Sequence, residues 1–310
     1  MDFLSKLGIL EADAREILQH DREYGAAIQR LSQEYMSFAP KQFFRAYREG
    51  QRAESTQRRD TFLREARAVT GEENVPMAEL LFWLHCVPYA RAQYRQMGIP
   101  EEIFWDTVKD IGYKLEECKQ VSGKCGVVST WFFLHFDWQL ATFGRLQYQV
   151  RGFPKDHYAW AGFELNYGDP VYACHIPSSG KLSEELCLDS LQRAYEFLKK
   201  DLRSNILPVV CSSWMLFPPY VEKVFGDGSN LKAFAKMFDV VDVTPRESFE
   251  DGWRIFGPAF QGSTEGLPQD NSLRRNMVRY IKDGGEFGFG YGVLLYDGEK
   301  KKILNRQNTN

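Results

Sequence analysis

The chain has 310 residues with a formal net charge of −3. Its composition, 44% hydrophobic and 26% charged residues, is ordinary for a water-soluble globular protein and leaves room for two domains. Without a basic field, we expect neither nucleic acid nor an acidic membrane as a partner. The longest apolar run, residues 80–87, is far shorter than the ~20 residues that span a bilayer.

The start of the chain and its cysteines suggest a reducing compartment. Residues 1–7 have too short an apolar stretch for a signal peptide, and acidic residues follow. The cysteines lack metal-type spacing such as C-x-x-C, so we expect reduced, buried thiols and no metal site. They are Cys86, Cys118, Cys125, Cys174, Cys187 and Cys211. The cytoplasm is the expected location.

The first part of the chain has a helical pattern. Between residues 24 and 35, apolar side chains recur at the three-and-four spacing of an amphipathic helix. Further helices are predicted to begin near Ser55 and to cover residues 77–97, with a kink at Pro88, and 100–118. The Ser/Gly/Lys-rich loop at 122–126 is the candidate linker. The predicted domains are therefore 1–125 and 126–310.

Strand and helix signals alternate after this linker. Strands are predicted at residues 144–150, 158–165, 170–176, 206–215, 238–243, 252–256 and 289–296. Helices are predicted at residues 131–140, 183–202 and 272–282, with shorter ones beginning at Pro218 and after Ser229. The predicted fold class is α+β, an all-helical N-terminal domain followed by a mixed β-sheet flanked by helices.

The connection after residues 170–176 carries the strongest chemical signal. A β-rich run reaches His175, and Pro177 cannot continue the hydrogen-bond ladder. The loop that follows consists of Ser178, Ser179, Gly180 and Lys181. Backbone N–H groups, a glycine and a cation before a helix are the chemistry that holds phosphate. The alternative is an ordinary strand-to-helix connection in which the serines and glycine only satisfy caps.

Several short motifs together resemble one family. They are residues 97–103 (MGIPEEI), 106–107, 110–111, 144–148 (GRLQY), 175–177 (HIP), 211–216 (CSSWML) and 229–230 (SN). The chain resembles bacterial acyltransferase-domain proteins of natural-product biosynthesis, which join a helical N-acyltransferase-type N-terminal domain to a GNAT-like C-terminal domain. The resemblance runs from about residue 80 to 295. It departs at the phosphate loop, where the usual Gln/Arg and Gly-x-Gly or Gly-x-Ala signature is absent.

The resemblance implies a place for acyl-CoA. In the GNAT fold this co-substrate lies between the fourth and fifth strands, with its pyrophosphate on the loop after the fourth. Residues 170–176 and 206–215 would be these strands, and the loop from Ser178 to Lys181 would hold the diphosphate. The implied function is an acyl-CoA-dependent N-acyltransferase acting on a small-molecule acceptor in natural-product biosynthesis. The alternative, favoured by the missing signature, is a non-catalytic GNAT-like module that binds a ligand or a partner.

Catalysis in such a fold needs a base and a proton donor for the departing thiolate. His175 is the preferred base by residue type, because an unperturbed imidazole titrates near pH ~6.5. It could equally be a histidine packed at a strand end, in which case Glu164 would serve as the base. Ser213 and Tyr220 are the candidate donors. Cys211 together with His175 resembles a nucleophile pair, but its apolar setting favours a buried thiol.

Two further patterns have structural alternatives. The basic helix carries Arg274, Arg275, Arg279 and Lys282, which form either a solvated face or a contact with a cofactor phosphate or an acidic partner. Gly288, Gly290 and Gly292 fall within a predicted strand rather than between a strand and a helix. We therefore expect close packing of the backbone against a ligand or a bulge at these glycines, rather than a nucleotide-binding fingerprint.

Overall fold

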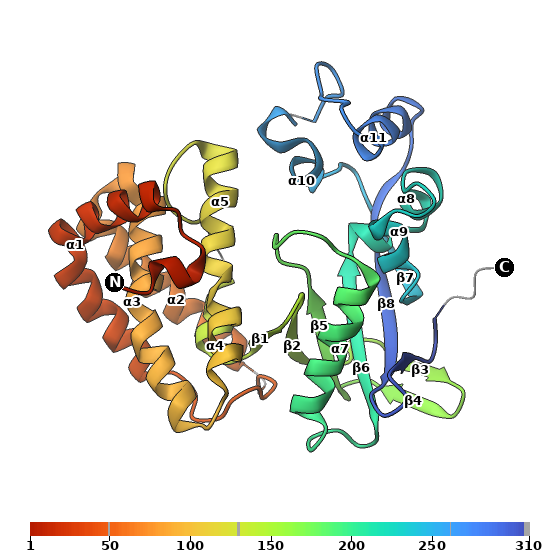
Figure 1. Cartoon of the computed structure of the whole chain (residues 1–310), viewed down its shortest axis with the longest axis horizontal. Helices are drawn as coiled ribbons and strands as arrows, with labels where there is room; N and C mark the ends of the chain where they lie inside the picture. Colours follow the sequence, from red (N-terminus) through yellow and green to blue (C-terminus); the bar gives the residue numbers. More distant parts are fainter. Residues whose placement is uncertain (49, 129–130, 261, 307–310) are drawn as a thin grey trace. The chain divides into compact units, whose positions relative to one another are not determined.

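The structure is a computed structural model that describes residues 1–48, 50–128, 131–260 and 262–306 (Figure 1). It divides into two compact units. The first comprises Met1–Phe143 with Gln147–Val150, and the second comprises Gly144–Leu146 with Arg151–Asn310. The first unit is built mainly of helices and the second of a mixed sheet with flanking helices, which confirms the predicted fold class. The domain boundary expected after residue 125 stays a prediction.

The helices of the first unit follow the predicted pattern with local differences. Their bounds are α1 Glu11–Ser37, α2 Gln51–Thr70, α3 Val75–Gln96, α4 Glu101–Val108, α5 Asp110–Ser122 and α6 Phe133–Phe136. Helix α3 continues past Pro88 to its end. The helix predicted at 100–118 is divided at Lys109 into α4 and α5. The helix predicted at 131–140 is only α6, because the short strand β1, Leu140–Phe143, begins soon after it.

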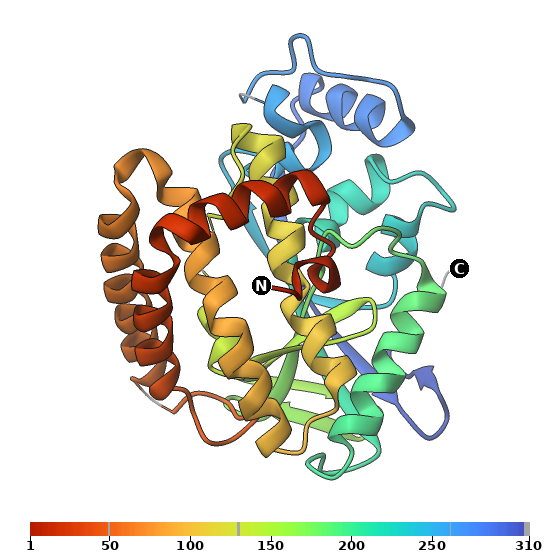
Figure 2. The same ribbon diagram turned by 60° about the vertical axis from the view of Figure 1, so that its left-hand side comes forward.

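Helix α3 lies at the centre of the first unit. Every residue from Met77 to Leu84 is buried, so this part of the helix needs neighbours on all sides. Helices α1, α2, α4 and α5 contact it (Figure 2). The Trp83 ring stacks on Phe136, with the centroids 5.1 Å apart, and meets Tyr35 edge-on at 5.6 Å. Among the described helices, none is long and apolar enough to cross a membrane.

The sheet of the second unit contains both parallel and antiparallel pairs. Its strands lie in the order β5-β6-β8-β7, and β9 pairs with β8. Strands β5 and β6 are parallel, whereas β8 runs antiparallel to β6 and β7. Their bounds are β5 Pro170–His175, β6 Ile206–Ser213, β7 Asp239–Arg246, β8 Phe287–Asp297 and β9 Lys302–Ile303. Strand β2, Leu146–Gly152, starts in this unit and matches the strand predicted at 144–150.

Helices complete the second unit (Figure 1). They are α7 Glu184–Leu198, α8 Pro218–Lys223, α9 Asn230–Ala235, α10 Gly252–Phe256 and α11 Ser272–Lys282. Helix α7 contacts β8 and its turn, because Tyr296 Oη donates to Gln192 Oε1 at 2.8 Å and the Tyr195 ring lies against Gly298.

Two predicted strands differ from the structure. The one expected at 158–165 is a separate hairpin of β3, His157–Trp160, and β4, Phe163–Asn166. Ala161 and Gly162, both with positive φ, make its turn. The strand expected at 252–256 is wrong, since these residues form helix α10. Gly252, Ile255 and Phe256 are its buried residues, the three-and-four spacing of a helix, which the short run concealed.

The glycines of β8 allow another segment to lie directly on the strand. A Cβ at Gly290 would stand 2.2 Å from the Leu216 carbonyl oxygen, and one at Gly288 would stand 2.6 Å from the Phe217 ring. Leu216 ends a short 3₁₀ helix, Trp214–Leu216, that directly follows β6. The backbone is closely packed at these glycines, but its partner is the segment that follows β6. This contact fixes the path of the chain beyond β6.

Replacing Gly290 by alanine should therefore destabilise the protein. The added methyl group would collide with backbone that cannot move without disturbing β6, and overpacking of this kind costs about 1–3 kcal/mol. Gly226→Ala is the matched control, because its Cβ meets nothing within 4 Å. Equilibrium urea unfolding should give a lower free energy of unfolding for Gly290→Ala and a change within about 0.5 kcal/mol for the control. Equal losses would contradict the packing argument.

Candidate functional site

Strands β5 and β6 separate before either of them ends. Their parallel pairing joins Tyr172 to Val209 and Ala173 to Val210. Strand β5 continues to His175 and β6 to Ser213, and among the described residues their mutual pairing ends at Ala173 and Val210. The two strands are therefore parallel but do not pair with each other along their last residues. We refer to the region between their carboxyl ends as the opening.

The loop predicted to bind phosphate connects this end of β5 to helix α7. Gly180 has φ +98°, a conformation that favours glycine, and a Cβ there would meet nothing within 4 Å. Ser178, Gly180 and Lys181 are exposed. The helix is capped by the Ser183 hydroxyl, which accepts from the Leu186 N–H at 3.4 Å. The four predicted loop residues therefore lie at one end of β5, directly before a helix N-terminus.

Arg145 organises this loop from behind. Its guanidinium donates to three loop carbonyls, those of Lys181 at 2.7 Å, Pro177 at 3.0 Å and Gly180 at 3.1 Å. The side chain is buried, with 8% of the residue exposed. The three separate nitrogens of the guanidinium allow one side chain to reach three carbonyls that lie in different directions. The sequence analysis included Arg145 in a motif but did not assign it to the site.

These contacts also set the direction of the loop's backbone donors. In a trans peptide the C=O of one residue and the N–H of the next point in opposite directions. The structure contains no cis peptide bonds among the described residues. Since the carbonyls of Pro177, Gly180 and Lys181 face Arg145, the N–H groups of Ser178, Lys181 and Leu182 point away from it. Arg145 therefore holds three loop carbonyls on one side of the chain, and the N–H groups that follow them lie on the other side.

Acidic residues modify the charge of the first turn of α7. Glu184 and Glu185 occupy this turn, which opposes anion binding at the helix end. The Arg306 guanidinium pairs with both oxygens of Glu184, at 2.6 and 3.0 Å, and lowers the pKa of that carboxyl. One of the two charges is thus compensated within the protein. Lys181 adds an exposed cation beside the loop donors.

The structure brings His175 and Ser213 to the same end of the sheet. His175 is the last residue of β5 and is half-buried, whereas Ser213 is the last of β6. The Ser213 hydroxyl oxygen accepts from the Met215 N–H at 3.1 Å, which leaves its own hydrogen available for donation. Both residues lie beyond the last pair of β5 with β6. Their placement suits a base and a donor at the opening.

Tyr220 lies on helix α8, within an aromatic cluster. Its ring is fully buried and meets Phe217, Phe249 and Tyr280, with centroids 4.9, 5.5 and 5.5 Å away. Burial, together with the charge of Tyr280, raises the pKa of Tyr220 above its ordinary value. The hydroxyl would remain protonated at neutral pH, as a donor must.

Glu164 lies away from the other candidates. It is exposed on β4 and lines a small cavity of about 60 Å³ with Pro170 and Ile206, where β5 and β6 begin. His175 and Ser213 stand at the opposite ends of these strands, and five residue steps along β5 span roughly 16 Å. The structure does not bring Glu164 to the opening.

The cysteines near the opening are buried. Cys211 is 2% exposed. Its thiol lies next to that of Cys174, and this contact together with burial raises the pKa of Cys174. Such surroundings favour the buried-thiol interpretation over a nucleophile. Within the described ranges, no group of three His, Cys, Asp or Glu side chains is placed to hold a metal ion.

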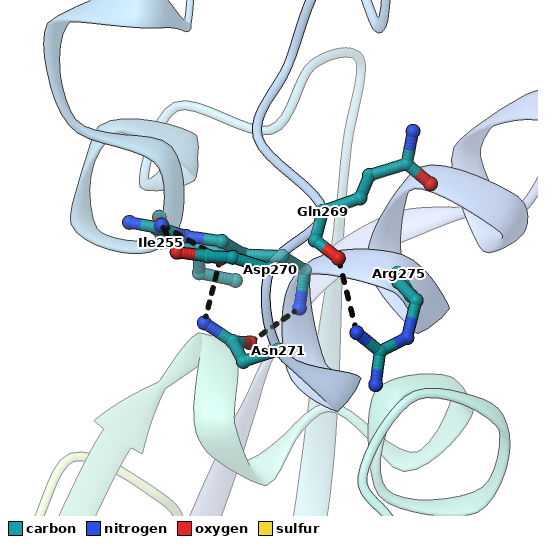
Figure 3. Close-up of polar contacts among 6 residues, drawn as sticks. Ile255, Gln269, Asp270, Asn271 and Arg275 are labelled. Atoms are coloured by element: carbon teal, nitrogen blue, oxygen red, sulfur yellow. Dashed lines mark hydrogen bonds and ion pairs between the residues drawn. The ribbon is translucent and has the colours of Figure 1, made fainter.

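The arginines at the start of α11 make contacts within the protein (Figure 3). Arg274 donates to the Ile255 carbonyl at 2.9 Å and pairs with Asp270, while Arg275 donates to the Gln269 carbonyl at 3.0 Å. The Asn271 side chain caps the helix by accepting from the Arg274 N–H at 3.0 Å. These arginines therefore anchor the segment before α11 to α10 and to its own helix.

Comparison with known proteins agrees with this geometry. The GNAT-like C-terminal domain family matches residues 140–294, and the N-acyltransferase N-terminal domain family matches residues 1–138. No curated protein matches the chain at a significant level.

Solved structures show the same fold. A crystal structure of an acyltransferase mutant in complex with octanoyl-CoA is 22% identical, covers 94% of this chain and 86% of its own, and has a TM-score of 0.68. An acyltransferase in complex with decanoyl-CoA and teicoplanin has the same identity and coverage with a TM-score of 0.67. One in complex with decanoyl-CoA is 20% identical, with the same coverage and a TM-score of 0.69. The chain therefore belongs to the family of proteins that join an N-acyltransferase N-terminal domain to a GNAT-like C-terminal domain.

Proposed function

We propose that this protein is an acyl-CoA-dependent N-acyltransferase that modifies a small-molecule acceptor. The observation that carries the proposal is the loop from Pro177 to Leu182, whose carbonyls are held by Arg145 so that its N–H groups face away. A diphosphate needs several backbone donors, and we assign this role to the loop N–H groups together with the N-terminus of α7. Lys181 would add a point charge to the same group.

The opening between β5 and β6 suits the rest of the co-substrate. Beyond Ala173 and Val210 the facing edges of the two strands have no pairing with each other among the described residues. Buried backbone groups require hydrogen-bond partners, and the pantetheine arm of CoA carries two amides that could pair with a strand edge. The thioester would then lie near the ends of β5 and β6, where His175 and Ser213 are found.

Acyl transfer at this position requires movement of protons. The acceptor amine must lose a proton as it attacks the thioester carbonyl, and the C–S bond then breaks to release CoA as a thiolate that takes up a proton. We assign His175 as the base, and Ser213 or Tyr220 as the donor to the thiolate. Glu164 is too far along the strands to share this role without a rearrangement.

For the acceptor and for the cellular location of the reaction, we propose only a general class. One solved neighbour is in complex with teicoplanin as well as decanoyl-CoA, which supports a small-molecule acceptor of natural-product type. Reacting the protein with acetyl-CoA and decanoyl-CoA over a panel of primary amines, with mass spectrometry of the products, tests the activity. Binding of acyl-CoA without transfer to any amine would instead favour the non-catalytic binding module. We place the reaction in the cytoplasm.

Gly180→Ala should abolish or strongly weaken acyl-CoA binding. The methyl group would both strain a residue at φ +98° and stand where a phosphate approaches the backbone. Gly162→Ala is the matched control, since it has φ +86° and an equally open Cβ position on the β3–β4 turn. Calorimetry with decanoyl-CoA should show a loss of about tenfold or more in affinity for the first variant alone. Unchanged affinity in Gly180→Ala would place the diphosphate elsewhere.

Arg145→Lys keeps the positive charge, but a single ammonium nitrogen cannot reach three carbonyls that are spaced for three guanidinium nitrogens. We expect it to weaken acyl-CoA binding by about tenfold, because the loop N–H groups lose their alignment. Lys181→Ala should weaken binding less but reduce its dependence on salt, since it removes an exposed charge. Calorimetric titrations at two ionic strengths measure both effects. If Arg145→Lys bound acyl-CoA as the unmodified protein does, the loop geometry would not matter for binding.

His175→Gln should retain acyl-CoA binding and lose turnover by about 10²–10⁴-fold, the usual contribution of a general base. Its rate profile should lack the inflection near neutral pH that an imidazole gives. His157→Gln, on β3 in the same unit, is the control and should keep both the rate and the profile. Full turnover in His175→Gln would exclude this residue as the base.

A further inference from the structure

The helical unit contains a positively charged cavity. It has a volume of about 670 Å³, within the range of pockets that hold metabolite-sized ligands. Among the described residues that line it, Lys41, Arg45, Arg48 and Arg58 are cations, and Glu54 is the single carboxylate. The cavity lies within the first unit, formed by the segment after α1, the start of α2 and the residue before β1.

Arg58 is fixed in place at this cavity. Its Nη2 donates to Asp137 Oδ1 at 2.6 Å, and the fully buried Asp137 also accepts from Tyr47 Oη at 2.9 Å. The guanidinium lies over the rings of Tyr35 and Phe38, 5.3 and 6.0 Å from their centroids. Its Nε is buried and has no hydrogen-bond partner within the part of the chain that the structure describes. Arg58 is thus a pre-oriented donor.

Gln139 provides the complementary unpaired group. The residue lines the cavity and is only 2% exposed. Its Nε2 donates to the Asp137 carbonyl at 3.3 Å, which fixes the orientation of the amide. The Oε1 atom is buried and, across the described ranges, accepts no hydrogen bond. A buried acceptor without a hydrogen-bond partner raises the free energy of the folded protein, so we expect a donor from outside the protein to pair with this atom.

We propose that this cavity binds a small organic anion that carries a hydroxyl or amino group next to its acidic group. The cations and the free Nε of Arg58 would hold the oxyanion, in part through charge-assisted hydrogen bonds. The adjacent donor would satisfy Gln139 Oε1. This proposal is independent of acyl-CoA binding and uses none of the residues of the β5–α7 loop.

Glycolate and acetate are matched probes, because they differ only by the hydroxyl group. Titration of the ¹⁵N-labelled full chain, followed by NMR of the arginine Nε–H and glutamine amide signals, should show saturable shifts for both anions. We expect the dissociation constant of glycolate to be about threefold to tenfold lower, the range for one hydrogen bond. Inorganic phosphate is the third probe and tests whether a phosphate replaces the carboxylate. Absence of saturable shifts with all three anions would overturn the proposal.

Two variants test separately the role of the cations and the role of the Gln139 acceptor. Arg48→Gln should weaken all three anions about threefold or more, whereas Arg30→Gln on α1, which does not line the cavity, should not. Gln139→Met keeps the size of the side chain and should remove the preference for glycolate. Equal weakening by both arginine variants, or an unchanged preference in Gln139→Met, would contradict the assignment. If Gln139→Met does not fold, the glycolate-to-acetate ratio in the unmodified protein decides the donor. Gly180→Ala should leave these affinities unchanged.

Discussion

The separation of β5 from β6 is the constraint on which the second unit depends. Strand β6 remains paired with β8 to its last residue, where Ser213 lies opposite Gly290, while its pairing with β5 stops at Val210. The glycines of β8 then receive Leu216 and Phe217 on the surface of the strand. Strand β6 is therefore held on one side and continued by a packed turn, so β5 is free to diverge. The early end of the pairing between β5 and β6 is consistent with these contacts.

Much of this arrangement could be predicted from the sequence because the signals are local. The buried run of β6 shows as consecutive apolar residues, and the end of β5 shows as a histidine followed by a proline. The loop was predicted from its small residues and its position before an amphipathic helix. The glycines of β8 were interpreted as sites of close backbone packing because no helix follows them, but their partners, Leu216 and Phe217, were not predicted. Each of these inferences needed only residues within about ten positions of one another.

The remaining features depend on contacts between residues far apart in the sequence. Arg145 precedes the loop it organises by more than thirty residues, and no periodicity relates the two. Glu164 was proposed beside His175 because both were assigned to consecutive strands. In the structure Glu164 belongs to a separate hairpin, whose turn at Ala161 and Gly162 the sequence analysis did not recognise. The helix at 252–256 was predicted as a strand because five residues are too few to distinguish a period of two from one of 3.6.

Arg145 also explains how the loop departs from the glycine-rich signature of the GNAT fold. Glycines in such a signature let backbone N–H groups approach an anion and adopt the dihedral angles that point them toward it. Here a single glycine at positive φ gives the turn, and an arginine held behind the loop fixes three carbonyls. In a trans peptide the carbonyl and the following N–H point in opposite directions, so the direction of the carbonyl also determines that of the N–H. The Arg145 contacts therefore weaken the argument from the missing signature for a non-catalytic module, because they order the loop in a way that no local motif records.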